Sequence, residues 1–442
     1  MRALVLRGFG DAAVEDVPDP VPGPGEVVID VACVQPSVTE CMLLAGEPVA
    51  MHTVLAERLA AGPTRFGGHE FAGVITALGP GVVPRPPSPH SPPSRIPPSR
   101  TPAPVSPAPG VHSPGGPRPG APAPGAPSSG TSSAGDPAQL DLATRTPLVA
   151  AFPTSAPAGG RPDSGLAVGD RVTAVETATC GQCAACRRAR PDACRSPEVL
   201  GFTGPGAFAE RVVVAARTVV RVPDGVPAAH VAAVQPLAGA IHGHAIAAVK
   251  PGDTVLVIGA GVMGVLHTQV ARHGNAGLII VTGRSAAKRA LAKRAGADLV
   301  LDATADDIVA HVMDATDGIG ADVVFECAGE FEQAVRCARR GGTVVMVSVL
   351  SDHAPAPLAR LRERSVSLLH PRSGAGGYAP GSTVFEHALR LVQRGDVDLQ
   401  GLISHRLAGV EALPEALEIT RYKGRYSALG PAQVDLFDWN RA

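Results

Sequence analysis

The feature that most constrains the fold of this chain is a glycine-rich turn between an apolar strand and a helix. The motif Gly259-Ala-Gly261-Val-Met-Gly264 follows the run TVLVI and opens a helical pattern at residue 262. Strand-like and helix-like segments alternate around it. Because buried strands that alternate with helices of this length form doubly wound parallel sheets, we predict an α/β fold. The expected strands are 254–258, 278–282, 299–301, 322–326 and 342–347, and the expected helices are 262–272 and 285–295.

The three glycines of this turn are typical of dinucleotide binding. The first permits a tight turn, the second lets a pyrophosphate approach the backbone, and the third lets helix and strand pack closely. The phosphates would then lie at the positive end of the helix. The residues expected to contact the nucleotide here are Gly259, Gly261, Val262, Met263 and Gly264.

The end of the second strand indicates which nucleotide is bound. NAD sites normally place Asp or Glu there, where the carboxylate accepts hydrogen bonds from the ribose 2′-hydroxyl. Here residue 283 is glycine, and Arg284, Ser285, Lys288 and Arg289 follow it. These side chains can donate hydrogen bonds to a 2′-phosphate, and none of them is a carboxylate that would repel it. We predict NADP(H) rather than NAD(H). The alternative is that Arg284 and Lys288 only begin a solvated helix.

Four cysteines lie close together in the spacing Cys180-x2-Cys183-x2-Cys186-x7-Cys194. Four thiolates so close in sequence can surround one Zn²⁺ tetrahedrally. Free or disulfide-bonded cysteines are the alternative, but the N-terminal residues are too acidic for the apolar core of a signal peptide. We therefore predict a structural zinc site in a cytoplasmic protein.

Composition excludes some partners. The formal net charge of −1 argues against nucleic acid, which would need a basic face. The sequence contains no run of 18 apolar residues, so we expect no membrane span. Between Pro84 and Pro127, 18 of 44 residues are proline. A segment of this kind cannot bury enough apolar surface to offset its ordering entropy, so we expect a solvated insertion at about 83–164. A docking arm for proline-recognising domains is the alternative.

The chain resembles the zinc-containing medium-chain dehydrogenase/reductase family, also called the alcohol dehydrogenase family. The resemblance implies a GroES-like, β-rich catalytic domain over 1–235 with a structural zinc lobe at 180–194. It further implies a Rossmann domain over 236–372 and a return to the catalytic domain over 373–442. The motifs that carry it are PDPVPGPGEVVIDV, GHEFAG at 68–73, VGDRV at 168–172, the four cysteines, PLAGAIHG at 236–243, GAGVMG and DVVFECAG at 322–329.

Members of that family usually bind a second, catalytic zinc, and here this chain departs from the pattern. An alignment without gaps puts Ser37 at the ligand cysteine and Thr39 at the hydroxyl that contacts the substrate oxygen. Gln235 stands where many relatives have glutamate, while His69 and Glu70 are retained. Since Ser and Gln offset the charge of Zn²⁺ poorly, we expect no stable catalytic zinc at Ser37, His69, Glu70 and Gln235.

Other polar residues near these motifs have less specific interpretations. Glu40 falls at the usual Asp of the family motif. Cys33 or Cys41 could replace the missing ligand, although plain core burial is the favoured interpretation. His242 and His244 are expected to be structural residues of a helix.

The resemblance therefore implies an NADP(H)-dependent oxidoreductase that moves hydride between nicotinamide and an alcohol or carbonyl substrate. One alternative is a zinc-independent reductase of a conjugated alkene or an imine, with Thr39, His69 or Glu70 supplying protons. Another is a catalytically silent NADP-binding protein. A small-molecule substrate and a homodimer or homotetramer are expected by resemblance.

Overall fold

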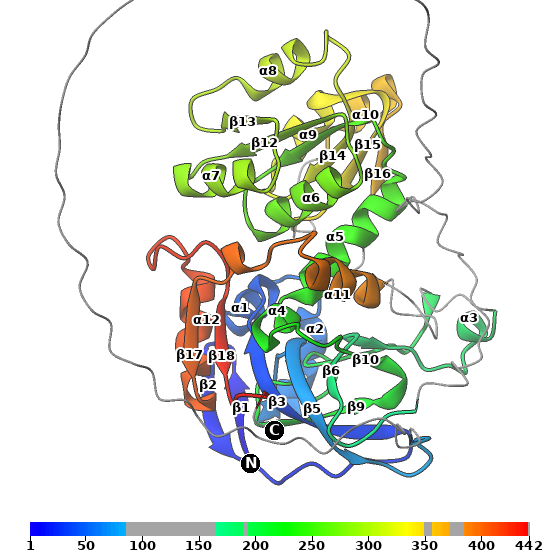
Figure 1. Cartoon of the computed structure of the whole chain (residues 1–442), viewed down its shortest axis with the longest axis vertical. Coiled ribbons are helices and arrows are strands. Elements are labelled where there is room, and N and C mark those ends of the chain that lie inside the picture. The colour runs from blue at the N-terminus through cyan, green and yellow to red at the C-terminus, as the bar shows by residue number, and fades with distance from the viewer. Residues whose placement is uncertain (85–164, 189–192, 349–355, 372–383, 441–442) are drawn as a thin grey trace, which may run out of the picture. The chain divides into compact units, whose positions relative to one another are not determined.

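A computed structural model describes residues 1–84, 165–188, 193–348, 356–371 and 384–440 of the chain. Most of the predicted insertion at about 83–164 therefore lies outside the described residues. Figure 1 shows the arrangement of the described elements. No helix among them is long and apolar enough to cross a membrane.

The N-terminal and C-terminal parts of the chain share a seven-stranded sheet with the order β10-β6-β5-β3-β18-β17, and β9 also pairs with β3. The central strand β3 is buried along nearly its whole length, as expected for a strand with neighbours on both sides. The strands are β3 (Glu26–Gln35), β5 (Glu70–Leu78), β6 (Arg171–Ala174), β9 (Arg211–Ala215), β10 (Val219–Arg221), β17 (His405–Ala408) and β18 (Ala432–Asp435).

The C-terminal segment joins this sheet through β18, whose Val434 pairs with Val34 of β3 in antiparallel register. The C-terminal strand β18 therefore lies beside β3 of the N-terminal part of the chain. The helix α5 (Val234–Ala247) runs across the boundary expected between residues 235 and 236. A separate three-stranded sheet has the order β2-β1-β4 and consists of β1 (Arg2–Gly8), β2 (Asp11–Asp16) and β4 (Thr64–Arg65).

The middle of the chain forms a six-stranded parallel sheet with the order β13-β12-β11-β14-β15-β16. The predicted doubly wound α/β fold is confirmed. Along the chain, β12 and β13 are added on one side of β11, and β14, β15 and β16 are then added on its other side. The strand order therefore reverses between β11 and β14. The strands are β11 (Thr254–Ile258), β12 (Leu278–Gly283), β13 (Leu299–Asp302), β14 (Ala321–Glu326), β15 (Ala338–Met346) and β16 (Ser367–Leu369).

Some element bounds in this region differ from the prediction. Strand β15 begins at Ala338 rather than at residue 342, because an irregularity of register lets Ala338 pair with Ala321. The predicted helix 285–295 is α7 (Ala286–Arg294), preceded by Ser285 as its N-cap. The other helices of this region are α6 (Val262–His273), α8 (Ile308–Asp314), α9 (Phe331–Cys337) and α10 (Leu358–Arg364).

The remaining described helices lie in the N-terminal and C-terminal parts of the chain, where α4 packs against β3 and β5, α2 against β1, and α11 against α5. Helix α11 is strongly amphipathic and buries one face that includes Phe385 and Leu389. Helix α12 packs against α1 and β18. These helices are α1 (Val38–Leu44), α2 (His52–Ala60), α4 (Ala228–Ala232), α11 (Val384–Arg394) and α12 (Leu413–Arg421).

Candidate functional site

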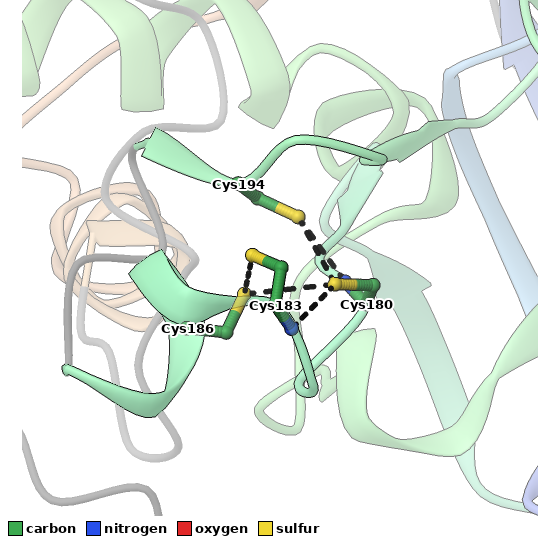
Figure 2. Close-up of side chains that lie close together, drawn as sticks. All are labelled: Cys180, Cys183, Cys186 and Cys194. Carbon is green, nitrogen blue, oxygen red and sulfur yellow. Dashed lines mark hydrogen bonds between the residues drawn. The ribbon is translucent and has the colours of Figure 1, made fainter.

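The four predicted zinc ligands come together in one small lobe (Figure 2). Cys180 follows the short strand β7 (Thr177–Ala178), which pairs with β8 (Glu198–Val199), while Cys183 caps the short helix α3 (Ala184–Arg187) and Cys186 lies inside it. All four sulfur atoms lie within 4.8 Å of one another. The fourth sulfur comes from Cys194, and none of the four cysteines is in a disulfide.

The distances between these sulfur atoms fit a tetrahedral metal site. Sγ of Cys183 is 3.5 Å from Sγ of Cys186, and Sγ of Cys180 is 3.6 Å from that of Cys194 and 3.9 Å from that of Cys186. Sulfurs bound at about 2.3 Å to one zinc would lie about 3.8 Å apart. The backbone N–H of Cys183 also donates to Sγ of Cys180, as suits a thiolate. The lobe therefore has the donor set and the spacing of a structural zinc site.

The glycine turn after β11 has the close packing that the motif predicts. Gly259 has φ = +104°, and a Cβ on Gly264 would lie 1.8 Å from the carbonyl oxygen of Gly259. A Cβ on Gly261 would meet no atom within 4 Å, so the turn is open at that residue. Gly261 is also the N-cap of α6, and a glycine has no side chain to accept the first N–H groups of the helix. These N–H groups are suited to an anionic ligand.

The end of β12 carries the cationic residues that the sequence analysis predicts. Arg284 and Ser285 are exposed and Lys288 is half-buried. Burial and the nearby charge of Arg284 lower the pKa of Lys288. A Cβ on Gly283 would lie 2.8 Å from Cβ of Ala260, so a larger residue does not fit easily at this strand end.

One carboxylate near the end of β12 is not predicted from the sequence. Asp302 ends β13 and pairs with Gly283 across the sheet. Its carboxylate lies 2.7 Å from the guanidinium of Arg289, which also donates to the carbonyl oxygens of Gly283 and Arg284. Arg289 is therefore used to hold the turn and to balance Asp302. Of the cationic and hydroxyl side chains predicted at this strand end, Arg284, Ser285 and Lys288 are not engaged in this way.

Ser37, the residue at the expected ligand position, serves as a helix cap in this structure. Its Oγ accepts a hydrogen bond from the backbone N–H of Glu40 at 3.1 Å, and the carboxylate of Glu40 accepts one from the backbone N–H of Ser37 at 2.7 Å. This reciprocal pair is a capping box at the start of α1. The hydroxyl of Ser37 is thus engaged with the backbone, and it lacks the charge of a thiolate ligand.

The imidazole of His69 is held by Glu40. Its Nδ1 lies 2.8 Å from Oε1 of Glu40, which also accepts the backbone N–H of Gly68 at 2.6 Å. Both side chains are buried, and that of Glu40 is 0% exposed. The other ring nitrogen, Nε2, lies 3.8 Å from Oε1 of Glu70. The ring also packs beside Phe202, with centroids 5.1 Å apart. Glu40 therefore orients the imidazole and directs Nε2 toward Glu70.

Two buried amide–carboxylate contacts complete the surroundings of His69. The amide of Gln35 donates to Glu70 at 2.6 Å and accepts a hydrogen bond from the amide of Gln433 at 2.9 Å. The amide of Gln235 donates to Oε1 of Glu176 at 3.1 Å. Among the described residues, Oε2 of Glu176 has no hydrogen-bond partner although it is buried. Gln35, Glu176 and Gln433 carry no signal in the sequence, because only the fold brings them to this site.

The charges at this site follow from burial and from one ion pair. Burial opposes the charged form of His69, but Glu40 beside it raises the pKa of the imidazole to about 9. Burial likewise opposes ionisation of Glu40, yet His69 and the backbone donors lower the pKa of that carboxyl. Burial raises the pKa of Glu70 to about 7 and also raises that of Glu176. The preferred state is a His69–Glu40 ion pair beside two carboxyls that retain protons more readily than usual.

The donor set at this second position does not fit a zinc ion. Gln235 is neutral and its amide hydrogens face Glu176, while the hydroxyl of Ser37 caps a helix. Within the described parts of the chain, the cysteine lobe is the one group of three or more His, Cys, Asp or Glu whose ligand atoms lie within 4.8 Å of one another. His69 and Glu70 therefore lack the converging anionic ligands that a tetrahedral zinc requires.

The remaining candidate residues lie as follows. Thr39 is half-buried in the first turn of α1, between Ser37 and Glu40. Cys41 is buried with its thiol directed to the carbonyl oxygen of Leu417, and burial raises its pKa to about 12. Neither this thiol nor that of Cys33, which is also buried, belongs to a group of converging ligands.

The two helix histidines are placed differently. His244 stacks on Phe325 in the interior of the parallel-sheet region, with ring centroids 4.3 Å apart, and burial lowers its pKa to about 3. His242 is half-buried in the same helix.

Comparisons with protein families match two parts of the chain. The zinc-binding dehydrogenase family matches residues 261–394, and the alcohol dehydrogenase GroES-like domain matches residues 157–224. The chain is 32% identical over 260 residues to an L-threonine 3-dehydrogenase of Pyrococcus horikoshii, with 58% of this chain and 73% of that protein covered. It is 32% identical over 250 residues to a sorbitol dehydrogenase of Halalkalibacterium halodurans, with 55% and 71% covered.

Solved structures share the fold. A zinc-binding dehydrogenase of Sinorhizobium meliloti bound to NADP matches with a TM-score of 0.69 at 24% identity, over 98% of this chain and 99% of that chain. The galactitol-1-phosphate dehydrogenase of Escherichia coli matches with a TM-score of 0.70 at 19% identity, over 99% of this chain and 100% of that chain. At these identities the likeness supports the fold alone.

Proposed function

Because this chain belongs to the zinc-containing medium-chain dehydrogenase/reductase (alcohol dehydrogenase) family, we propose that it is an NADP(H)-dependent oxidoreductase that transfers hydride between nicotinamide and the alcohol or carbonyl carbon of a small molecule. The observation that carries the choice of cofactor is the end of β12, where Arg284 and Lys288 follow a glycine and where Arg289 balances Asp302. A 2′-phosphate would meet cationic donors there and no uncompensated carboxylate.

The nucleotide would be held by two sets of groups. The backbone of Gly259, Gly261, Val262, Met263 and Gly264 would meet the pyrophosphate at the start of α6. Arg284, Ser285 and Lys288 would meet the 2′-phosphate. Bound NADPH would supply the hydride, and the protein would supply orientation and a proton.

The proton would come from His69 when a carbonyl is reduced. As hydride adds to the carbonyl carbon, the C=O π electron pair moves to oxygen, and Nε2–H of the imidazolium donates its proton there. Glu40 holds the other ring nitrogen at 2.8 Å and stabilises the positive charge before transfer. Oxidation of an alcohol would run in reverse, with neutral His69 as the base. Thr39 and Glu70 are proposed to position the substrate oxygen by hydrogen bonding.

The four cysteines of the lobe are proposed to hold one structural zinc, which would stabilise that lobe without taking part in the reaction.

A second candidate function is reduction of a conjugated alkene or an imine. The observation that favours it is the loss of anionic ligands at Ser37 and Gln235, since such substrates need no metal-bound oxygen. A panel of ketones, enones and imines with NADPH would separate these functions. A chain that binds NADPH and reduces none of them would support the catalytically silent alternative.

Replacing Arg284 with alanine tests the proposed cofactor. Loss of a charge-assisted hydrogen bond to the 2′-phosphate should weaken NADPH binding by about 10-fold or more and leave NADH binding within about 2-fold. Fluorescence titration with both nucleotides measures this difference. Arg294→Ala, an exposed substitution at the other end of α7, is the matched control and should change neither affinity. Equal losses for NADPH and NADH in the Arg284 variant would reject the assignment.

A further inference from the structure

A buried carboxylate ends the strand beside the glycine turn. Glu326 is the last residue of β14 and pairs with Ile258, the last residue of β11. Its side chain is 0% exposed. Since the strand order reverses between β11 and β14, Glu326 lies at the point of the sheet edge where doubly wound folds bind ligands.

Glu326 collects donors from two separate segments. Its Oε1 accepts the backbone N–H groups of Ala328, Gly329 and Glu330 at 2.7, 2.6 and 3.0 Å. Its Oε2 accepts the hydroxyl of Ser348, which lies just beyond β15. Three successive N–H groups that converge on one anion form a nest of the kind that binds phosphate in other proteins. Here the chain fills the nest with its own carboxylate.

The loop held by Glu326 lies directly against the glycine turn. A Cβ placed on Gly259 would lie 3.0 Å from Cβ of Ala328 and 3.2 Å from the carbonyl oxygen of Cys327. The backbone N–H of Cys327 donates to the carbonyl oxygen of Ile258 at 2.9 Å. The loop after β14 thus forms one wall of the turn, and its shape depends on the hydrogen bonds to Glu326.

We propose that Glu326 is a positioning residue for the nucleotide: it fixes residues 327–330 against Gly259 and occupies their N–H groups, so that the pyrophosphate binds at the start of α6. This inference rests on the proposed function, because it presupposes that the glycine turn binds a dinucleotide. In this role Glu326 acts on the nucleotide only through the backbone of residues 327–330 and takes no part in the hydride transfer.

The experiment compares NADPH affinity and thermal stability in three variants. Glu326→Ala should weaken NADPH binding by about 10-fold or more, because four hydrogen bonds to a charged acceptor are lost. Glu326→Gln should stay within about 3-fold of the wild type, since its amide oxygen can still accept the three N–H groups and its amide nitrogen can donate to Ser348. Asp307→Ala is the matched control: Asp307 caps α8 by accepting the N–H of Ala310, so its loss should lower Tm and leave NADPH affinity unchanged.

The outcomes separate this inference from the proposed function. Wild-type protein that binds neither NADPH nor NADH would overturn both. Wild-type protein that binds NADPH, with Glu326→Ala folded and equal to it in affinity, would overturn the role of Glu326 alone. A parallel loss of affinity in Asp307→Ala would also overturn it, because the effect would then follow stability. If Glu326→Ala does not fold, Glu326→Asp takes its place: it keeps the charge, withdraws the carboxylate by one methylene, and should still weaken NADPH binding.

Discussion

Replacing His69 with glutamine should lower kcat/KM for carbonyl reduction by about 10²–10⁴-fold, the usual contribution of a positioned general acid. Glutamine keeps a hydrogen-bonding side chain in the same place but has no acidic proton to transfer to the substrate oxygen. Because His69 directly precedes β5, outside the parallel sheet that carries the glycine turn, NADPH affinity should remain within about 2-fold of the wild type. Steady-state kinetics and nucleotide titration measure the two quantities on one preparation. His311→Gln, on the exposed face of α8, is the control and should leave both unchanged.

The pH dependence of the wild type follows from the same residue. Glu40 raises the pKa of His69 to about 9 against the effect of burial, so the imidazole carries its proton at neutral pH. The rate of reduction should therefore be steady near pH 7 to 8 and fall as the pH rises through about 9. The His69→Gln variant should lack this fall. A reduction rate that rises through this pH range, or a His69→Gln variant with wild-type kcat/KM, would show that His69 is not the acid.

Replacing Glu40 with alanine should have the largest effect on stability at this site, a loss of about 3–5 kcal/mol in the free energy of unfolding. The substitution removes the counter-ion of buried His69, which must then stay charged without its partner or give up its proton, and it frees the backbone N–H groups of Ser37 and Gly68. Ser37→Ala is the matched control, because it removes only the other half of the capping box and should cost about 0.5–2 kcal/mol. Urea denaturation of the wild type and both variants at pH 7 measures the two losses.

The deficit of the Glu40 variant should depend on pH in a defined direction. The pKa of Glu40 is lowered in the folded state, so its stabilising contribution is present above its unfolded pKa and is lost as the pH falls through the lowered folded value. The gap between wild type and Glu40→Ala should therefore be widest near neutral pH and should narrow in acid. A gap of the same size as that of Ser37→Ala, or one that widens in acid, would contradict the ion pair.

Local patterns in the sequence predict the strands β11 to β15 of the parallel sheet and the cysteine lobe. The turn at Gly259 and the strands around it follow from apolar runs, glycine spacing and helix periodicity, each of which acts over a few residues. The cysteine lobe is equally local, since its four sulfurs come from fifteen consecutive positions. Short strands and helices such as β16 and α8 carry too few residues for a clear period, and the sequence analysis does not find them.

The site around His69 could be predicted only in part. The alignment places Ser37 and Gln235 near it, but their partners depend on contacts over long sequence separations. Gln235 meets Glu176, 59 positions earlier, and Gln35 meets Gln433, 398 positions later. No local pattern reports such pairs, because they exist only once β3, β18 and α5 have packed together. The role of Ser37 as a helix cap does have a local signal, because residues 37–40 match the Ser-x-x-Glu pattern of a capping box. This pattern was not used in the prediction.

We propose that this chain binds one structural zinc at its four-cysteine lobe and that a His69–Glu40 ion pair stands where relatives bind a second metal. The zinc content of the purified chain, measured by plasma mass spectrometry beside a Cys194→Ser variant, tests this proposal. We expect one zinc per chain in the wild type and a loss of that zinc in the variant. Two zinc ions per wild-type chain, with one retained when Cys194 is replaced, would contradict it.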